Sequence, residues 1–268
     1  MNTIVITGAS SGIGKTTAKY FAGKGWKVAA TMRKPEDEAE LGTVKNVCIY
    51  ALDVTDENSI QNTAQRIISD FGKVDVVLNN AGYGLMGPFE AASSEQIKKQ
   101  YDTNVFGLMG VTRAFLPHFR EQKSGMFINV SSIGGIATFP LFSLYHGTKW
   151  AVEGFTESLS YELSGLGIQV KLIEPGVIST EFSGRSMTWA SKDGLTEYNA
   201  VIEKIMNNPS LRAGSPPELV AETIYTAATD GKPQLRYVSG PDAEQLSELR
   251  RANGGDAFVA TIKQMMLS

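Results

Sequence analysis

Hydrophobic and polar positions along this chain form two kinds of segment. Short runs rich in valine and isoleucine are separated by longer stretches in which apolar residues recur with helical spacing. The short runs predict β-strands and the longer stretches predict amphipathic helices. The predicted strands are Thr3–Thr7, Val28–Met32, Val47–Leu52, Val74–Leu78, Met126–Val130, Gln169–Ile173 and Arg236–Val238. The predicted helices are Ile13–Lys24, Glu57–Phe71, Glu95–Arg120, Tyr145–Leu163, Glu218–Thr229 and Asp242–Leu249.

Strands that alternate with helices predict an α/β fold with a parallel seven-stranded sheet, doubly wound so that helices cover both faces. The nearly continuous apolar run Val74–Leu78 is typical of a strand buried on both faces. The chain shows no repeat and no linker, so we expect a single domain over residues 1–268. Within it, residues 181–217 predict a lid insertion and residues 241–268 a C-terminal helical extension.

Composition limits the classes of function. The chain has 268 residues, 42% of them hydrophobic, and a net charge of −3, which favours neither nucleic-acid nor polybasic membrane binding. One cysteine and two histidines exclude a disulfide framework and predict no metal site. Cys48 lies in an apolar run and is expected to be buried. No run is long enough to span a membrane, and a strand begins at Thr3, so we expect a cytoplasmic protein without a signal peptide.

The first predicted strand leads directly into a glycine-rich turn that precedes a helix. Glycines let the backbone approach a pyrophosphate, and the free N–H groups of the helix N-terminus then face that anion. A plain strand–turn–helix corner is the alternative. We favour a Rossmann-type dinucleotide site, with cofactor contacts from Gly8, Ser10, Ser11, Gly12, Ile13 and Gly14.

The end of the second strand bears on the choice of dinucleotide. An acid there would bind the ribose 2′-hydroxyl of NAD, whereas an arginine accommodates the 2′-phosphate of NADP. This chain has Arg33 and Lys34, and its first acid comes at Glu36. We therefore expect NADP(H) to be preferred over NAD(H), with Lys34 or Lys15 as helpers. The alternative is that Arg33 and Lys34 are a solvated charge pair.

Two further strand ends carry candidate cofactor contacts. After the third strand, Asp53 and Val54 could meet the adenine, although an acid here could instead cap the next helix. After the fourth strand, Asn80, Ala81 and Gly82 would let a flat ligand approach the backbone, with an Asx-type turn as the alternative.

Tyr145 and Lys149 are four residues apart in a predicted helix, so their side chains share one face. A free phenol has a pKa of about 10, and a nearby cation favours the phenolate. Such a tyrosine can exchange a proton with an alcohol or a ketone near neutral pH.

Taken in order, these motifs resemble those of the short-chain dehydrogenase/reductase family, in its NADP-preferring branch, and are similar to steroid- and retinoid-type dehydrogenases. The resemblance covers residues 1 to about 240. It rests on the glycine-rich turn, Asn79-Asn80-Ala81-Gly82, Asn104, Asn129-Val130-Ser131-Ser132, Tyr145-x-x-x-Lys149 and Pro175-Gly176.

The resemblance implies four catalytic residues. Tyr145 would be the general acid/base, and Lys149 would hold the nicotinamide ribose and lower the tyrosine pKa. Ser132 would hydrogen-bond the substrate oxygen, with Ser131 as its rival, and Asn104 would hold a water in a proton relay. The segment that passes the nicotinamide would comprise Pro175, Gly176, Val177, Ile178 and Thr180.

The chain departs from the family pattern at His146-Gly147-Thr148, where Ser and Ala are commoner. We expect His146 to point away from the reaction and to pack or contact an interface. The resemblance further implies a homodimer or homotetramer that pairs the helices Glu95–Arg120 and Tyr145–Leu163, although their apolar stripes could instead simply cover the sheet.

We expect an oxidoreductase that interconverts an uncharged, lipophilic ketone or aldehyde and its alcohol. Two alternatives remain: a non-catalytic NADP-binding sensor or scaffold, and an epimerase that uses its cofactor transiently. Residues of the substrate pocket, for which core packing is the alternative, would be Tyr83, Leu85, Met86, Phe139, Leu141, Phe142 and, from the lid, Phe182, Met187 and Trp189. Arg185 and Lys192 are also in the lid.

Overall fold

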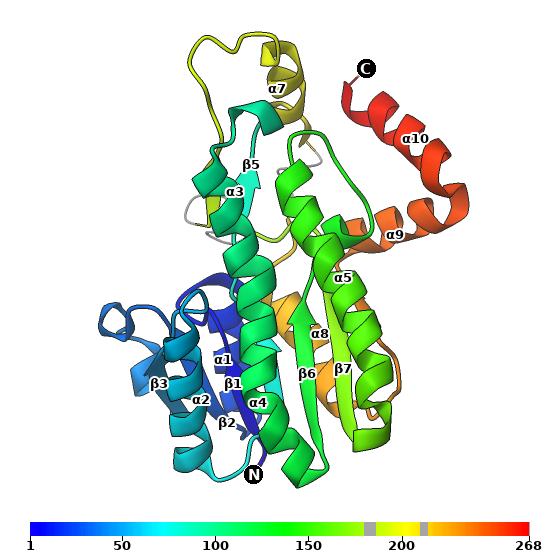
Figure 1. The fold of residues 1–268 in the computed structure, drawn as a ribbon. Helices are drawn as coiled ribbons and strands as arrows, with labels where there is room; N and C mark the ends of the chain where they lie inside the picture. The colour runs from blue at the N-terminus through cyan, green and yellow to red at the C-terminus, as the bar shows by residue number, and fades with distance from the viewer. Residues whose placement is uncertain (180–185, 210–213, 268) are drawn as a thin grey trace.

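A computed structural model describes residues 1–179, 186–209 and 214–267. Its main sheet has seven parallel strands in the order β3-β2-β1-β4-β6-β7-β9 (Figure 1). This arrangement confirms the doubly wound α/β fold predicted from the alternating pattern. The strands are β1 (Thr3–Ile6), β2 (Lys27–Met32), β3 (Val47–Ala51), β4 (Val76–Asn79), β6 (Gly125–Val130), β7 (Ile168–Pro175) and β9 (Arg236–Ser239).

Helices cover both faces of this sheet, and a separate apolar cluster lies between each helical layer and the strands. One layer contains α1 (Gly12–Gly23) and α8 (Pro217–Thr229). The other contains α2 (Glu57–Phe71), α4 (Leu108–Gln122) and α5 (Ser143–Leu163). Short 3₁₀ turns occur at Pro35–Asp37, Leu41–Thr43, Phe89–Ala91, Ile133–Gly135 and Ser164–Leu166.

The predicted helix Glu95–Arg120 is not one regular helix. It consists of α3 (Ser94–Tyr101), a π-helical segment (Asp102–Gly107) and α4. The wider turn contains Asn104, whose side chain bonds the main chain of Tyr83. Hydrophobic spacing does not reveal a π-bulge, which typically marks a functional site.

A third apolar cluster lies beyond the carboxyl edge of the sheet and includes the C-terminal helices. Here α9 (Pro241–Asn253) and α10 (Gly255–Leu267) contribute Ala243, Phe258 and Ile262 to the cluster. Residues 186–209, the described part of the predicted lid insertion before the gap at 210–213, contain two elements that we did not expect. Here β8 (Met187–Trp189) pairs with β5 (Gly84–Met86), and α7 (Asn199–Met206) follows. Sequence pattern missed all three because they are too short to show a period.

Cys48 is exposed, contrary to our expectation. It lies in β3, which ends the main sheet and pairs only with β2 within it. An edge strand has an uncovered side, so an apolar run there does not guarantee burial.

Lys171 is buried in β7 and is 1% exposed. Its ammonium donates to Asp230 Oδ1 at 2.9 Å, to Ala227 O at 2.7 Å and to Tyr237 Oη at 2.9 Å. Three partners satisfy the buried charge and connect the end of α8 to β7 and β9.

Candidate active site

A cleft of about 570 Å³ lies along the carboxyl edge of the main sheet. Ligands bind at this edge in open α/β sheets, where the strand order reverses on either side of β1. The structure brings most of the predicted site residues together there. Among the lining residues are Gly8, Ser10, Ser11, Gly12, Ile13, Gly14, Arg33, Asp53, Val54, Asn80, Ala81, Gly82, Ser132, Tyr145, Lys149, Pro175, Gly176 and Ile178.

Hydrogen bonds from the loop after β4 hold the glycine-rich turn. Asn80 Nδ2 donates to the carbonyl oxygens of Thr7 and Gly8 at 2.9 and 3.1 Å. The Thr7 hydroxyl accepts the main-chain N–H groups of Asn80 and Ala81 at 2.9 and 3.0 Å. Asn80 therefore stabilises the glycine-rich turn, and the Thr7 hydroxyl stabilises it in the same way.

Two glycines of the turn allow close approach of backbone to backbone. A Cβ on Gly8 would lie 2.8 Å from Ala81 Cα, and one on Gly14 would lie 2.4 Å from Gly8 O. Gly8 also has a φ of +68°, which favours glycine. The N-cap Ser11 makes no side-chain cap bond at the start of α1, so the helix N-terminus presents N–H groups suited to a pyrophosphate. The chain thus fits a dinucleotide here.

Arg33 is exposed on the lining of the cleft, directly after β2. Lys15, expected as a possible helper for a 2′-phosphate, has other partners. Its ammonium lies 3.0 Å from a carboxylate oxygen of Glu38 and 3.0 Å from one of Glu40. Neither Lys15 nor Lys34 lies among the residues that line the cleft, which leaves Arg33 as the basic group best placed for phosphate at the end of β2.

The acids after β3 have different roles. Asp53 lines the cleft and accepts the N–H and hydroxyl of Thr55 at 2.9 and 2.7 Å. Asp56 caps α2 by accepting N–H groups of Asn58 and Ser59. The helix cap predicted among these residues is therefore Asp56, and Asp53 does not cap the helix.

Tyr145 and Ser132 are hydrogen-bonded to each other across the cleft. Burial raises the pKa of Tyr145, and the bond with Ser132 lowers it in part. Ser131 has a buried hydroxyl without a hydrogen-bond partner among the described residues. Of the two candidate serines, Ser132 is therefore the one that interacts with the tyrosine.

Lys149 is 8% exposed, and its ammonium lies 5.6 Å from the centroid of the Tyr145 ring. It donates to Val130 O at 2.9 Å, which fixes it against the end of β6. Burial lowers the pKa of Lys149 to about 8, while the negative charge of Glu153 raises it. Lys149 is therefore still mostly protonated at neutral pH, but it loses its proton at a lower pH than an exposed lysine.

Asn104 does not line the cleft, although its side chain holds a loop that does. Oδ1 accepts the Tyr83 N–H at 3.0 Å, and Nδ2 donates to Tyr83 O at 2.9 Å and to Thr148 Oγ1 at 3.1 Å. The Thr148 hydroxyl in turn donates to Tyr145 O at 2.7 Å. Asn104 therefore connects the loop after β4 with the helix that carries Tyr145.

The unusual residues between Tyr145 and Lys149 each have a packing role. His146 is 4% exposed, and its ring stacks on Phe142 with centroids 5.7 Å apart. Its Nδ1 accepts the Phe139 N–H at 3.3 Å, and burial lowers its pKa to about 4. Gly147 leaves room for the hydroxyl of Tyr101, which would lie 2.5 Å from a Cβ. His146 therefore packs as a neutral ring.

Asp242, at the start of α9, supports the predicted nicotinamide segment. Its Oδ2 accepts the Val177 N–H at 2.7 Å, and a Cβ on Gly176 would lie 2.2 Å from the same carboxylate. Sequence pattern gave no signal for this contact, which joins residues 65 positions apart. Val177 is not among the lining residues, and Thr180 lies outside the described residues.

The predicted substrate walls are only partly at the cleft. Tyr83 lines it, together with Ser186, which precedes β8, and Thr188, which lies in β8. The other described apolar candidates do not line the cleft: Leu85, Met86, Phe139, Leu141, Phe142, Met187 and Trp189. Most of these belong to the third apolar cluster. Phe182 and Arg185 lie outside the described residues.

Comparison with known proteins shows similarity over most of the chain. A family model described as short chain dehydrogenase matches residues 2–191. An oxidoreductase of Schizosaccharomyces pombe is 43% identical over 88% of this chain and 99% of its own. The 3-ketodihydrosphingosine reductase of Bacteroides thetaiotaomicron is 35% identical over 89% and 87%. Retinol dehydrogenase 8 of Homo sapiens is 30% identical over 98% and 90%.

Solved structures show the same fold. A short-chain dehydrogenase from Streptomyces avermitilis has a TM-score of 0.85 and 31% identity, over 98% of this chain and 97% of its own. The structure named ElxO with NADP bound has a TM-score of 0.74 and 28% identity, over 88% and 97%.

Proposed function

The chain belongs to the short-chain dehydrogenase/reductase family of oxidoreductases, and we propose from its site that it uses NADP(H) to interconvert a lipophilic ketone or aldehyde and its alcohol. The observation that carries this proposal is the hydrogen bond between Tyr145 and Ser132 on the lining of a dinucleotide-sized cleft, with Lys149 beside it. A sensor would have no use for these proton-transfer groups.

The site residues suit this chemistry without further assumption. When bound, NADPH would supply the hydride that converts a carbonyl carbon to an alcohol. Ser132 and Tyr145 both offer O–H donors to the substrate oxygen, where negative charge develops in the transition state. Tyr145 then gives its proton to that oxygen as general acid, and recovers it as general base in the reverse direction. Lys149 would hold the cofactor ribose and stabilise the tyrosinate.

Preference for NADP(H) rests on Arg33. Its guanidinium lies at the end of β2, on the cleft, and can bind a phosphate with two parallel N–H bonds. The described residues that line the cleft near it include no acid from β2 that would favour NAD. Similar structures are named with NADP and with NADH, so the proposed preference depends on Arg33.

A lipophilic substrate is supported by the surroundings of the site and by the relatives. The third apolar cluster brings α7 and α10 together with Ile136, Phe139 and Phe142, which follow Ser132 in the chain. The names 3-ketodihydrosphingosine reductase and retinol dehydrogenase 8 refer to relatives that act on lipophilic carbonyls or alcohols. We expect residues 181–217 to close over such a substrate within a single domain.

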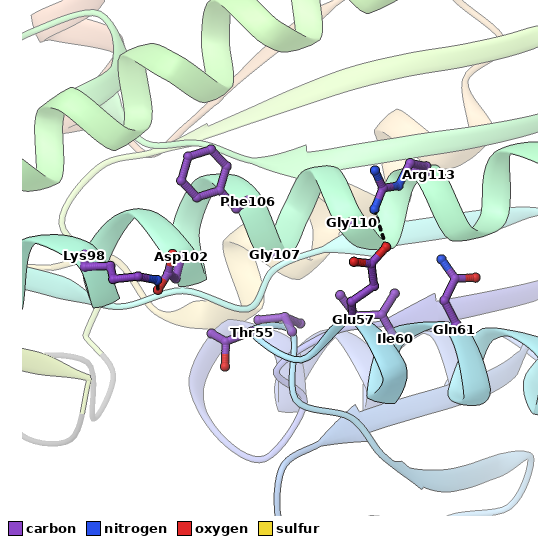
Figure 2. A pocket seen from close by; sticks show the side chains of 11 residues that line it. Thr55, Glu57, Ile60, Gln61, Lys98, Asp102, Phe106, Gly107, Gly110 and Arg113 are labelled. Atoms are coloured by element: carbon purple, nitrogen blue, oxygen red, sulfur yellow. Dashed lines mark hydrogen bonds and ion pairs between the residues drawn. The ribbon is translucent and has the colours of Figure 1, made fainter. Parts of the chain in front are cut away.

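Self-association would cover the outer face of α4. A groove of about 250 Å³ runs between α2 and α4, and Gly107 and Gly110 form part of its floor (Figure 2). Phe106 is 60% exposed beside it, and Arg113 pairs with Glu57 at its far end. We expect a second copy to bury Phe106 in a homodimer or homotetramer. Light scattering of the wild type and of Phe106→Ser would test this expectation.

No helix in the described ranges is long and apolar enough to cross a membrane. We propose separately that the protein is located in the cytoplasm.

The proposal is tested by mixing the protein with lipophilic ketones and with NADPH or NADH in parallel. We expect loss of absorbance at the reduced-nicotinamide band, faster with NADPH. Tight NADPH binding without turnover on a broad panel would favour the sensor. Conversion of substrate with no net change in the cofactor would favour the epimerase.

A further inference from the structure

Two acids and one base lie together next to the site without lining the cleft. Glu153 on α5 and Glu174 on β7 are 5% and 1% exposed. Arg236 on β9 contacts both, with its Nε 3.0 Å from Glu153 Oε2 and 3.4 Å from Glu174 Oε1. Two buried carboxyl groups therefore share one guanidinium, although a buried acid ordinarily needs its own partner.

The two carboxyl groups are also within hydrogen-bonding reach of each other. Ionised carboxylates only accept, so a bond between Glu153 and Glu174 requires a proton on one of them. Burial, and next the charge of Glu153, raise the pKa of Glu174 to about 7. Glu153 Oε1 and Glu174 Oε1 are otherwise buried without a hydrogen-bond partner in the described structure. A proton on Glu174 leaves Glu153 as the ionised partner of Arg236.

Glu153 is connected to the reaction site through Lys149. The two residues are four positions apart on α5, so their side chains lie on one face of the helix. The negative charge of Glu153 favours the ammonium form of Lys149, whereas burial favours the neutral amine. Lys149 donates a hydrogen bond to Val130 O, a neutral group that supplies no compensating charge.

We propose that Glu153, supported by Arg236 and Glu174, is a positioning residue that keeps Lys149 protonated while Tyr145 exchanges its proton. The inference rests on the function proposed above and adds a group that never touches substrate or cofactor. Charged and titratable groups near the Glu153–Glu174 pair come from four elements. They are Lys149 and Glu157 on α5, Glu174 itself on β7, Arg236 on β9 and Arg251, which acts on Glu174, on α9.

The test is the pH profile of Glu153→Gln. The amide oxygen of glutamine still accepts from Arg236, so the change removes the charge and keeps the shape. Lys149 then loses its proton at lower pH, and Tyr145 becomes harder to ionise. In alcohol oxidation we expect the rising limb of kcat against pH to move upward by roughly one pH unit.

Glu157→Gln is the matched control. Glu157 lies one turn further along α5, and its Oε2 accepts from Arg236 Nη2 at 2.6 Å, but its side chain is 44% exposed, whereas Glu153 is buried. Its variant should keep the wild-type profile. A Glu153→Gln profile that equals the wild type, or an equal shift in both variants, would overturn the role assigned to Glu153.

A second measurement does not need turnover. NADPH affinity is followed by nicotinamide fluorescence as the pH is raised. The affinity should fall when Lys149 loses its proton, and this fall should come at a lower pH in Glu153→Gln than in the wild type. An affinity profile that does not move would contradict the inference even if no substrate were found. A wild type that binds NADPH but reduces nothing would count against the proposed function alone.

Glu153→Met is a second variant for the case in which Glu153→Gln does not fold. It removes the same negative charge, and Arg236 keeps Glu174 and Glu157 as ion partners. The same downward shift of the affinity profile is expected, and an unshifted profile would again contradict the inference.

Discussion

Asn104 holds Tyr83 by both of its main-chain polar groups. The amide oxygen accepts the Tyr83 N–H at 3.0 Å, and the amide nitrogen donates to the Tyr83 carbonyl at 2.9 Å. A residue in a π-helical turn thereby fixes the loop after β4, and Tyr83 in that loop lines the cleft. The bond from Asn104 to Thr148 extends the same support to the helix of Tyr145.

We therefore expect Asn104→Ala to lose both stability and activity. Asn104 is 3% exposed, so the substitution leaves the Tyr83 N–H without its acceptor in a buried site. The free energy of unfolding, measured by urea titration, should therefore fall by about 2 kcal/mol. The value of kcat should fall as the loop and helix lose their connection. A variant with unchanged stability and kcat would mean that the loop is held by other contacts.

Arg33→Asp should reverse the cofactor preference. Loss of a charged hydrogen bond to the 2′-phosphate should raise the KM for NADPH roughly 10- to 100-fold, while NADH improves. Lys34→Ala is the control, because Lys34 is adjacent and exposed but does not line the cleft. If NADPH remained preferred in the Arg33 variant, the assignment of the end of β2 would be wrong.

Asp242→Ala should weaken cofactor binding, although Asp242 does not line the cleft. The change removes the acceptor of the Val177 N–H and the wall behind Gly176, so the segment after β7 is free to move. We expect the KM for NADPH to rise several-fold. Asp242→Asn keeps an acceptor oxygen and should stay close to wild type. Equal effects in the two variants would show that the hydrogen bond is not what matters.

The Lys171–Asp230 pair should make stability depend on acid pH. Burial raises the pKa of Asp230, but hydrogen bonds from the Lys232 N–H, Lys171 and Tyr237 outweigh it and lower the pKa to about 2. Because the pKa of Asp230 in the folded state lies below the ordinary aspartate value of about 4, the stability that it contributes is fully present above about pH 4 and is lost as pH falls toward 2.

Lys171→Met should destabilise the fold by about 3 kcal/mol at pH 7, because it leaves a mostly buried carboxylate without its cation. Urea unfolding would measure the loss. Adding Asp230→Asn should recover part of it, and a double variant less stable than Lys171→Met alone would contradict the pairing argument.

The sequence predicted well those features of the fold that interactions between neighbouring residues determine, such as the ends of a helix. The predicted helix Glu57–Phe71 has the observed bounds, because Asp56 caps its start and Gly72, with a φ of +74°, ends it. The gathering of most predicted site residues at one cleft was predictable, because many of them follow the carboxyl ends of strands, which a parallel sheet must bring to one edge.

Contacts between distant residues were not predictable. Asp242 meets Val177, and Arg236 meets Glu153 and Glu174, only because the sheet order places their elements side by side. The exposure of Cys48 likewise depends on which strand ends the sheet. The ion pairs of Lys15 with Glu38 and Glu40 depend on how the loop after β2 folds against α1.

Tyr145→Phe tests the central claim most directly. The substitution removes the hydroxyl that bonds to Ser132 and keeps the ring beside Lys149. NADPH binding, followed by fluorescence, should stay within a few-fold of wild type, while ketone reduction in the same sample should fall by about 100-fold or more, since general acid catalysis contributes about that much. Ketone reduction at the wild-type rate in this variant would contradict the assignment of Tyr145 as the proton donor.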